Sequence, residues 1–290
     1  MLVSALSIIL KRLHTIPTLI LFVFSLQLAQ PLARTNDYDQ TYYDLNKLKG
    51  LKGRSLKSAL HHLLDQTHRS QSYGALYYAY LEGDLDEEFE GDHSIMDMYS
   101  ERPGDSERYN YFSRGDTCGN YRGEGSCFNR EHLFPQSAFN KRSPMRTDYF
   151  HVYPTDGYVN NVRGSHPFGE VVDVEWTSEN GSKLGRNRAS GYSGDFFEPI
   201  DEFKGDIARA LLYFAIRYED RIRSFRHRML DGSDDRVYDK PFLDILLRWH
   251  KLDPVSAFEK RRNDNGFKFQ GNRNPLIDHP EWVSQIWDHI

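Results

Sequence analysis

The chain has 290 residues, of which 39% are hydrophobic and 14% aromatic, and this excludes an intrinsically disordered chain, which would be poor in aromatic residues. Two cysteines exclude a scaffold held together by many disulfides and a zinc site with several thiolate ligands. The formal net charge of −5 gives no overall basic field, and charge alone argues against a nucleic-acid partner.

Residues 1–29 are predicted to be a signal peptide that is cleaved near Ala29 to Ala33. Two basic residues precede an apolar run from Ile16 to Leu28, and small and polar residues follow it. This order is typical of export signals. The run is short for a membrane-spanning helix, which needs roughly 20 apolar residues. An uncleaved anchor and a buried core helix are the alternatives. Loss of the two basic residues, with no acid, would change the net charge from −5 to −7.

Residues 30–290 are predicted to form one α+β domain that is mostly helical in its second half. Helices are expected where apolar residues recur at helical spacing or where proline stands in a first turn. These segments are 55–68, 201–224, 241–251, 254–262 and 281–290. Residues 71–125 are expected to form loops with short strands, and the acidic stretch 83–92 within them a solvated surface loop.

The two cysteines, Cys118 and Cys127, lie nine positions apart in a glycine-rich segment. If the chain is exported, a local disulfide that closes this loop is favoured, because disulfides persist in oxidising compartments. Two buried free thiols are the alternative.

The densest polar cluster of the sequence is Asn129-Arg130-Glu131-His132, and a second polar stretch runs from Asp148 to Arg163. Neighbouring side chains on a strand point to opposite faces, so Glu131 can hold a metal while His132 acts on a substrate. A histidine near its reference pKa of about 6.5 suits general-base catalysis. Carboxylate and amide oxygens suit Mg²⁺ or Ca²⁺, and nearby arginines can bind phosphate. By residue type alone, a Glu-His pair on a surface helix is an equal alternative.

The residues from Phe128 to His132, with Pro135 and Ser137, resemble the Asn-Arg-Glu-His-x-x-Pro-x-Ser signature of the endonuclease I family. These are secreted or periplasmic bacterial nucleases of the His-Me finger (ββα-metal) type. The stretch from Asp148 to Arg163 is similar to the Tyr-Pro-Thr-Asp-Gly-x-Val-Asn block of that family. Further similar motifs follow in order, so the resemblance extends from about residue 40 to the C-terminus.

The resemblance implies a His-Me finger catalytic core at about residues 126–170, embedded in a largely helical domain. It implies that His132 is the general base that activates water. Glu131 and Asn160 would hold one divalent ion, Mg²⁺, with Ca²⁺ or Mn²⁺ as alternatives. The candidates for substrate binding are Arg130, Arg163 and Arg209. A Cys118–Cys127 bridge fits the loop that precedes the catalytic histidine in such a protein.

The function implied by the resemblance is a secreted or periplasmic, metal-dependent, nonspecific endonuclease. DNA is the expected substrate and RNA a further candidate, with no membrane association after signal cleavage and no protein partner. An exported non-catalytic nucleic-acid-binding protein and another exported metallohydrolase are the alternatives. The charge must then be uneven, because residues 130–146 hold four basic residues against Glu131 alone. This predicts a local basic cleft on an acidic body.

Overall fold

The computed structural model describes residues 41–187 and 193–290. The predicted signal peptide, residues 1–29, and its cleavage position lie outside these ranges. Leu48–Ile290 form one compact unit, and the described end of the preceding unit contains the start of a short helix, α2 (Leu45–Leu48). In the described part of the chain, no helix has the length and apolar character needed to cross a membrane.

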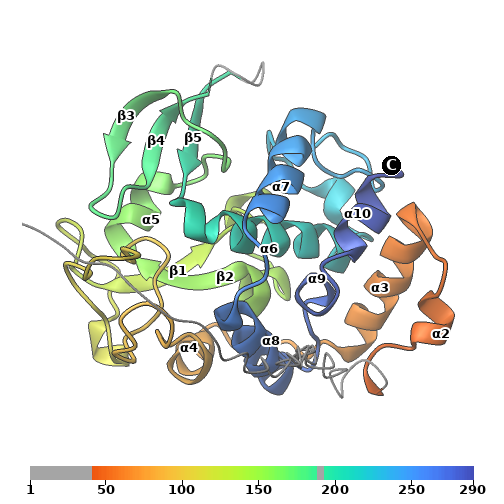
Figure 1. The fold of residues 1–290 in the computed structure, drawn as a ribbon, viewed down its shortest axis with the longest axis horizontal. Helices are drawn as coiled ribbons and strands as arrows, with labels where there is room; N and C mark the ends of the chain where they lie inside the picture. Colours follow the sequence, from red (N-terminus) through yellow and green to blue (C-terminus); the bar gives the residue numbers. More distant parts are fainter. Residues whose placement is uncertain (1–40, 188–192) are drawn as a thin grey trace, which may run out of the picture. The chain divides into compact units, whose positions relative to one another are not determined.

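Two antiparallel strands and one helix form a small ββα unit (Figure 1). Strand β1 (Phe128–His132) pairs with β2 (Val152–Asp156), and β2 leads directly into α5 (Gly157–Arg163), which packs against β1. The turn between strand and helix is fixed by Asp156, whose carboxylate accepts a 2.8 Å hydrogen bond from the backbone N–H of Val159. Such a cap satisfies a donor that the first turn of a helix leaves unpaired.

Close approach of α5 to β1 depends on glycine at the first position of the helix. A Cβ atom on Gly157 would lie 2.9 Å from a ring carbon of Tyr121 and 3.1 Å from Nδ2 of Asn129. Any larger residue would therefore push the helix away from the strand. The Asp-Gly pair thus sets both the start of α5 and its distance from β1.

A larger helical part surrounds α6 (Lys204–Arg217), in which all residues from 205 to 217 are buried. The helices that contact α6 are α3 (Gly53–Thr67), α7 (Lys240–Leu252) and α9 (Pro275–Asp278). The remaining α-helices of Leu48–Ile290 in the described ranges are α4 (Leu76–Gly83) and α8 (Ala257–Gln270), which pack on each other, and α10 (Trp282–Trp287), which packs on α3. Short 3₁₀ helices connect these elements: η1 (Arg114–Asp116), η2 (Gln136–Phe139), η3 (Met145–Thr147), η4 (Tyr149–His151), η5 (Asp201–Phe203) and η6 (Ile222–Ser224).

Aromatic packing joins the ββα unit to α6. Phe134, two residues after β1, stacks on Phe214 of α6 with ring centroids 4.1 Å apart, and Phe139 lies 6.1 Å from the same ring. All three side chains are fully buried. Stacked aromatic pairs add about 0.5–1.5 kcal/mol to the free energy that their burial supplies. The chain that follows β1 is therefore anchored on the central helix.

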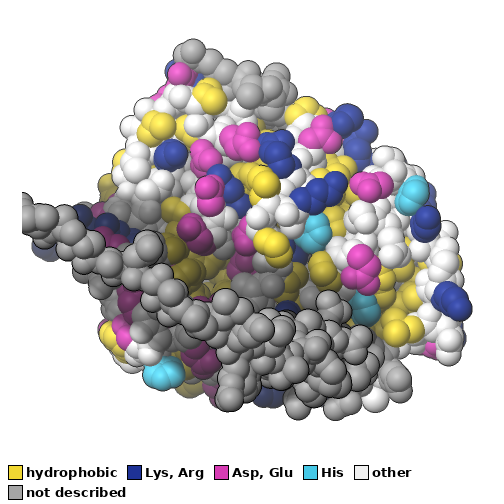
Figure 2. All heavy atoms as spheres, viewed as in Figure 1, with side chains coloured by type: hydrophobic (Ala, Val, Ile, Leu, Met, Phe, Trp, Pro, Cys, Tyr) yellow, Lys and Arg dark blue, Asp and Glu magenta, His cyan; other side chains and the backbone are white. Residues whose placement is uncertain are grey.

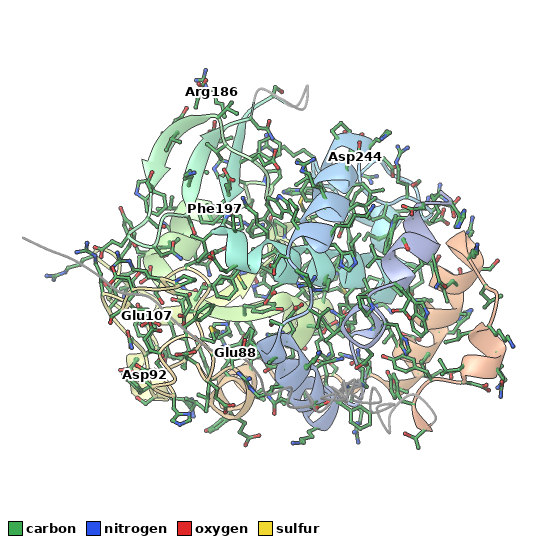
Figure 3. The ribbon with its side chains drawn as sticks, in the orientation of Figure 1. Glu88, Asp92, Glu107, Arg186, Phe197 and Asp244 are labelled. Carbon is green, nitrogen blue, oxygen red and sulfur yellow. A yellow bond between two sulfur atoms is a disulfide. The ribbon has the colours of Figure 1, made fainter. Side chains whose placement is uncertain are left out.

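A second antiparallel sheet has the strand order β3 (Asp173–Thr177), β4 (Lys183–Arg186) and β5 (Asp195–Glu198). Figure 3 shows Arg186 at the outer end of this sheet and Phe197 at its inner end. Phe197 is buried, and its ring lies 5.1 Å from that of Tyr99. The architecture is α+β, with two small sheets beside the helices.

The helices predicted at 55–68, 241–251 and 281–290 are confirmed, with ends shifted by a few residues, by α3, α7 and α10. The single helix predicted for 201–224 is divided into η5, α6 and η6, because apolar periodicity stops at the end of α6. Residues 71–125 contain the helix α4, where only loops and short strands were expected.

The helix predicted at 254–262 begins later and ends later than expected. The side chain of Ser256 accepts a bond from the backbone N–H of Glu259, and the Glu259 side chain accepts one from the N–H of Ser256. This capping box starts α8 at Ala257 instead of the proline. The last turns carry buried polar residues, such as Asn265, whose Nδ2 donates to the carbonyl of Ala79 at 2.9 Å. They therefore lack the apolar spacing that would reveal them in the sequence.

The prediction that residues 83–92 form a solvated surface loop was wrong for two of its acids. Asp84 is fully buried and pairs with Nε of Arg262 at 2.6 Å. Asp86 is also fully buried, and its two oxygens accept four backbone N–H groups, those of residues 88–91, at 2.8–3.0 Å. Each carboxylate is buried because it has specific donors, as buried charges require.

Candidate active site

A cavity of about 420 Å³ opens beside the ββα unit. It brings together most of the residues predicted from the sequence. Those that line it are Arg130, Glu131, His132, Asn160, Arg163 and Cys118. They come from both strand β1 and helix α5, with one residue from the loop that precedes β1. The predicted catalytic and metal-binding residues therefore face one common space.

His132 is the last residue of β1 and is only 4% exposed. Its Nε2 lies 3.1 Å from the backbone carbonyl oxygen of Arg146. Because a carbonyl can only accept, Nε2 carries the hydrogen and Nδ1 carries the lone pair. Burial, and then the neighbouring His151, lowers the pKa of His132 to about 3. The ring is therefore neutral at neutral pH, in the form that can accept a proton.

Glu131 precedes this histidine and is 1% exposed. Its Oε1 accepts hydrogen bonds from Nη1 of Arg163 at 2.7 Å and from the hydroxyl of Tyr99 at 3.3 Å. Burial raises the pKa of this carboxyl group, and the positive charge of Arg163 opposes the rise. Both bonds use the same oxygen, so the side chain is held in place while Oε2 takes no part in either of them.

Asn160 stands on α5, across from β1. Its Nδ2 donates a 2.6 Å hydrogen bond to Oδ1 of Asn129, which lies on the same strand as Glu131. This bond orients the amide and leaves its oxygen, Oδ1, as the atom that can coordinate a cation. Asn161, the next residue, is exposed and also lines the cavity.

The three candidate arginines have different surroundings. Arg130 is half-buried at the cavity wall, and its guanidinium carbon lies 3.5 Å above the ring of Tyr73. Arg163 is buried, and besides Glu131 it donates to the backbone carbonyls of residues 132 and 133 at 2.9 and 2.7 Å. Arg209 does not line the cavity; it is fully buried and donates two 2.6 Å bonds to Glu259. Only Arg130 combines the cavity wall with partial exposure.

The comparison with known proteins agrees with this geometry. The family model of endonuclease I matches residues 52–281. The chain belongs to the endonuclease I family. It is 35% identical over 253 residues, or 86% of this chain and 78% of the relative, to an extracellular ribonuclease of Bacillus amyloliquefaciens. It is 34% identical over 267 residues, or 90% of this chain and 83% of the relative, to an extracellular ribonuclease of Bacillus subtilis (strain 168). As a member of the family, the protein is a nuclease.

The disulfide expected for an endonuclease I protein of this sequence is present. Cys118 and Cys127 are bonded to each other, which confirms the predicted pairing. Cys118 lines the cavity, and Cys127 directly precedes β1. The backbone carbonyl of Cys127 also accepts the N–H of Gly157 at 2.9 Å. The bridge therefore ties a loop of the cavity wall to the point where β1 and α5 meet.

Of the four basic residues in 130–146 that were expected to form a basic cleft, only Arg130 lines the cavity of this endonuclease I protein. Two arginines, Arg130 and Arg163, and one acid, Glu131, line the cavity. Lys141 and Arg142 are exposed but do not line it. The face shown in Figure 2 carries basic and acidic side chains close together around α7, with no extended basic field.

Three residues of the site were not identified from the sequence. Tyr73 and Tyr77 line the cavity, and the centroid of the Tyr73 ring lies 3.5 Å from the guanidinium carbon of Arg130 and 4.0 Å from that of Arg146. Tyr99 supplies the second bond to Glu131. These tyrosines come from segments with no apolar periodicity, and only the abundance of tyrosine in residues 71–125 could have drawn attention to them.

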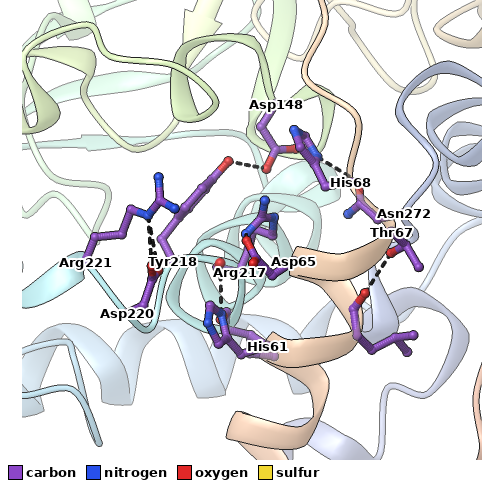
Figure 4. A network of polar contacts seen from close by, with 12 residues as sticks. His61, Asp65, Thr67, His68, Asp148, Arg217, Tyr218, Asp220, Arg221 and Asn272 are labelled. Carbon is purple, nitrogen blue, oxygen red and sulfur yellow. Dashed lines mark hydrogen bonds and ion pairs between the residues drawn. The ribbon is translucent and has the colours of Figure 1, made fainter.

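A buried polar network surrounds Asp148 (Figure 4). Asp148, just before β2, accepts hydrogen bonds from the hydroxyl of Tyr218 and from Nε2 of Gln270, both at 2.8 Å. Burial would raise the pKa of Asp148, but His68 and His151, with the bond from Gln270, bring it below its ordinary value. The carboxylate is therefore charged, and it links α6 and α8 to the start of β2.

Proposed function

We propose that this protein is an exported, metal-dependent endonuclease of the His-Me finger type that hydrolyses phosphodiester bonds of DNA and RNA without sequence preference. His132 is the general base, and Glu131 and Asn160 hold one divalent cation, Mg²⁺ in preference to Ca²⁺ or Mn²⁺. One observation carries the proposal: a neutral histidine of fixed tautomer, a buried carboxylate and an oriented amide face the same cavity on a ββα unit.

The donor set suits a hard divalent cation. Carboxylate and amide oxygens are the ligands that Mg²⁺ prefers, and Mg²⁺ is usually held by few protein groups. Glu131 is buried with one arginine and one hydroxyl on Oε1, and Asn160 is oriented through its Nδ2. A cation held by these two residues supplies positive charge to the phosphate oxygens and to the departing oxygen.

The contacts of His132 leave Nδ1 as the ring atom that can accept a proton from water. Water gives a proton to Nδ1, the resulting hydroxide forms a bond to phosphorus, and the bond from phosphorus to the departing sugar oxygen breaks. The carbonyl of Arg146 accepts the Nε2–H throughout and stabilises the imidazolium that forms. Arg130, with its planar fork, is the cavity-wall group suited to hold a neighbouring phosphate.

Export and the inclusion of RNA rest on separate supports. Both Bacillus relatives are extracellular ribonucleases. A disulfide in the active-site wall fits an oxidising compartment, and the first 29 residues have the pattern of an export signal. Contacts to a nonspecific substrate should be mainly to phosphate and sugar, which allows both nucleic acids.

The test is cleavage of plasmid DNA and of RNA by the mature protein with Mg²⁺ and with EDTA. His132→Ala should reduce the rate by about 10²–10⁴-fold, the usual contribution of a general base. His62→Ala, an exposed histidine on α3, is the matched control and should keep the wild-type rate. A His132→Ala protein that cleaves at the wild-type rate contradicts the assignment. Wild-type protein that binds nucleic acid without cleaving it supports the alternative of an exported binding protein.

A further inference from the structure

A second group of acids lies in the loops between α4 and β1, outside the catalytic cavity. Asp86, Glu90 and Glu107 each bring a carboxylate oxygen within 4.8 Å of the others. Figure 3 shows Glu107 in this loop region, below β1, together with Glu88 and Asp92. Acids that gather on a surface commonly bind nothing, so the cluster needs independent evidence of a ligand.

That evidence comes from Glu101. Its side chain is fully buried, and neither carboxylate oxygen accepts a hydrogen bond from an N–H or O–H donor of the described residues. The carboxyl group of Glu107 lies within hydrogen-bonding reach of it, and Asp86 is a further acid near it. A buried carboxylate with no donor is costly by several kcal/mol, which is why such groups are normally paired or bound to a metal.

No basic side chain compensates this group of acids. Within residues 41–187 and 193–290, no lysine, arginine or histidine forms an ion pair with Asp86, Glu90, Glu101 or Glu107. The nearest basic residue in sequence, Arg102, pairs with Asp105 instead. Asp84 in the same loop shows the contrast, because it is equally buried but has Arg262. Among the described residues, none therefore supplies positive charge to Glu101.

We propose that Glu90, Glu101 and Glu107, backed by Asp86, form a structural Ca²⁺ site that is separate from the catalytic cavity. Ca²⁺ takes six to eight oxygen ligands in a flexible arrangement, whereas Mg²⁺ requires a near-ideal octahedron and retains water. Several carboxylates on loops suit the first ion. Asp86 contributes chiefly negative charge, because its oxygens already accept four backbone N–H groups.

The site would brace the segment that supports the catalytic residues. The backbone N–H of Glu101 donates to the carbonyl of Asp97 at 3.0 Å. Tyr99, which lies between these two residues in the sequence, donates its hydroxyl hydrogen to Glu131. Asp97 itself accepts the backbone N–H of Asp156 on Oδ2 at 2.8 Å. A cation on Glu101 would therefore fix the backbone that holds Glu131 and the turn from β2 to α5, without contacting the substrate.

The test measures thermal unfolding and Ca²⁺ binding by calorimetry on metal-stripped mature protein. Glu131→Gln is the background, because it removes the proposed catalytic cation. At Ca²⁺ about 100-fold above the dissociation constant, we expect the unfolding temperature to rise by roughly 5 °C or more, with one ion bound. Glu101→Gln in that background should bind no ion and show no rise. Glu82→Gln, an exposed acid on α4, is the matched control and should respond like the background.

Two results would overturn the proposal: a background protein whose unfolding temperature does not respond to Ca²⁺, and an equal response in Glu101→Gln. Without Ca²⁺, Glu101→Gln should unfold at the same or a higher temperature than the background, because it removes a buried carboxyl group that has no hydrogen-bond donor. If it does not fold, the partly exposed Glu107→Gln carries the same test. The rival explanation is that these carboxyl groups share protons and bind no cation. In that case the free energy of unfolding would fall as pH rises and would not respond to Ca²⁺, and this outcome rejects the site.

Discussion

Replacing Arg163 by methionine tests whether this arginine supports the site or binds the substrate. It is 1% exposed and makes three bonds, to Glu131 at 2.7 Å and to the carbonyls of His132 and Leu133 at 2.9 and 2.7 Å. Removing one partner of a buried ion pair costs about 3–5 kcal/mol, because the other charge stays buried and unpaired. For a domain of this size, that lowers the unfolding temperature by roughly 10 °C.

The assay combines urea unfolding with cleavage kinetics at a temperature where the variant is folded. Arg248→Met is the matched control, because Arg248 forms an exposed pair with Glu170 and should change the unfolding free energy by less than about 1 kcal/mol. In a double-mutant cycle, Glu131→Gln should cancel part of the cost of Arg163→Met, since no charge is then left unpaired. The support role is refuted if Arg163→Met keeps wild-type stability and raises only KM.

Three further predictions follow from buried contacts. Cys118→Ser with Cys127→Ser should lower the unfolding free energy by about 2–3 kcal/mol, which urea unfolding of the oxidised and reduced wild type checks independently, since reduction should give the same loss. Burial lowers the pKa of His151 to about 4, below its unfolded value near 6.5, so its contribution to stability is complete above pH 6.5 and is lost as pH falls towards 4. That loss is at most about 3 kcal/mol, and a His151→Gln protein with the same slope of unfolding free energy against pH would contradict it. Arg209→Met should lower the unfolding free energy by about 3 kcal/mol and leave KM for nucleic acid unchanged, whereas a raised KM without lost stability would return Arg209 to the substrate-binding residues.

The predicted catalytic group could be read from the sequence because its parts are close along the chain. Glu131, His132 and Asn160 lie on a hairpin and the helix that follows it, so one strand pairing and one turn bring them together. The Asp-Gly pair at the turn is also a local signal, since Asp156 caps the helix. The family motifs within residues 128–163 were therefore enough to predict both the ββα unit and the residues that face the cavity together.

The surroundings of the site depend on contacts that are distant in sequence and leave no local pattern. The acid at position 84 was interpreted as a surface charge because its partner, Arg262, is 178 residues away. Arg209 was a substrate candidate for the same reason, since Glu259 lies 50 residues further along the chain. In both cases the sequence shows one charge of a buried pair, and only folding identifies the other.

The environments of two buried glutamates separate two effects of metal removal. Glu131 is held by Arg163 and Tyr99 with no cation bound, so we expect it to keep its position when the metal is removed. The carboxylate oxygens of Glu101 accept no hydrogen bond from a donor among the described residues. A chelator that removes the cation held by Glu131 should therefore stop nucleic-acid cleavage without unfolding the core around this residue. By emptying the second site, it should also destabilise the segment from Asp97 to Glu101. Restoring Mg²⁺ alone should recover cleavage while the unfolding temperature stays low, because only the second site prefers Ca²⁺. Cleavage and thermal stability should therefore recover separately, because Glu131 is paired with an arginine and Glu101 is not.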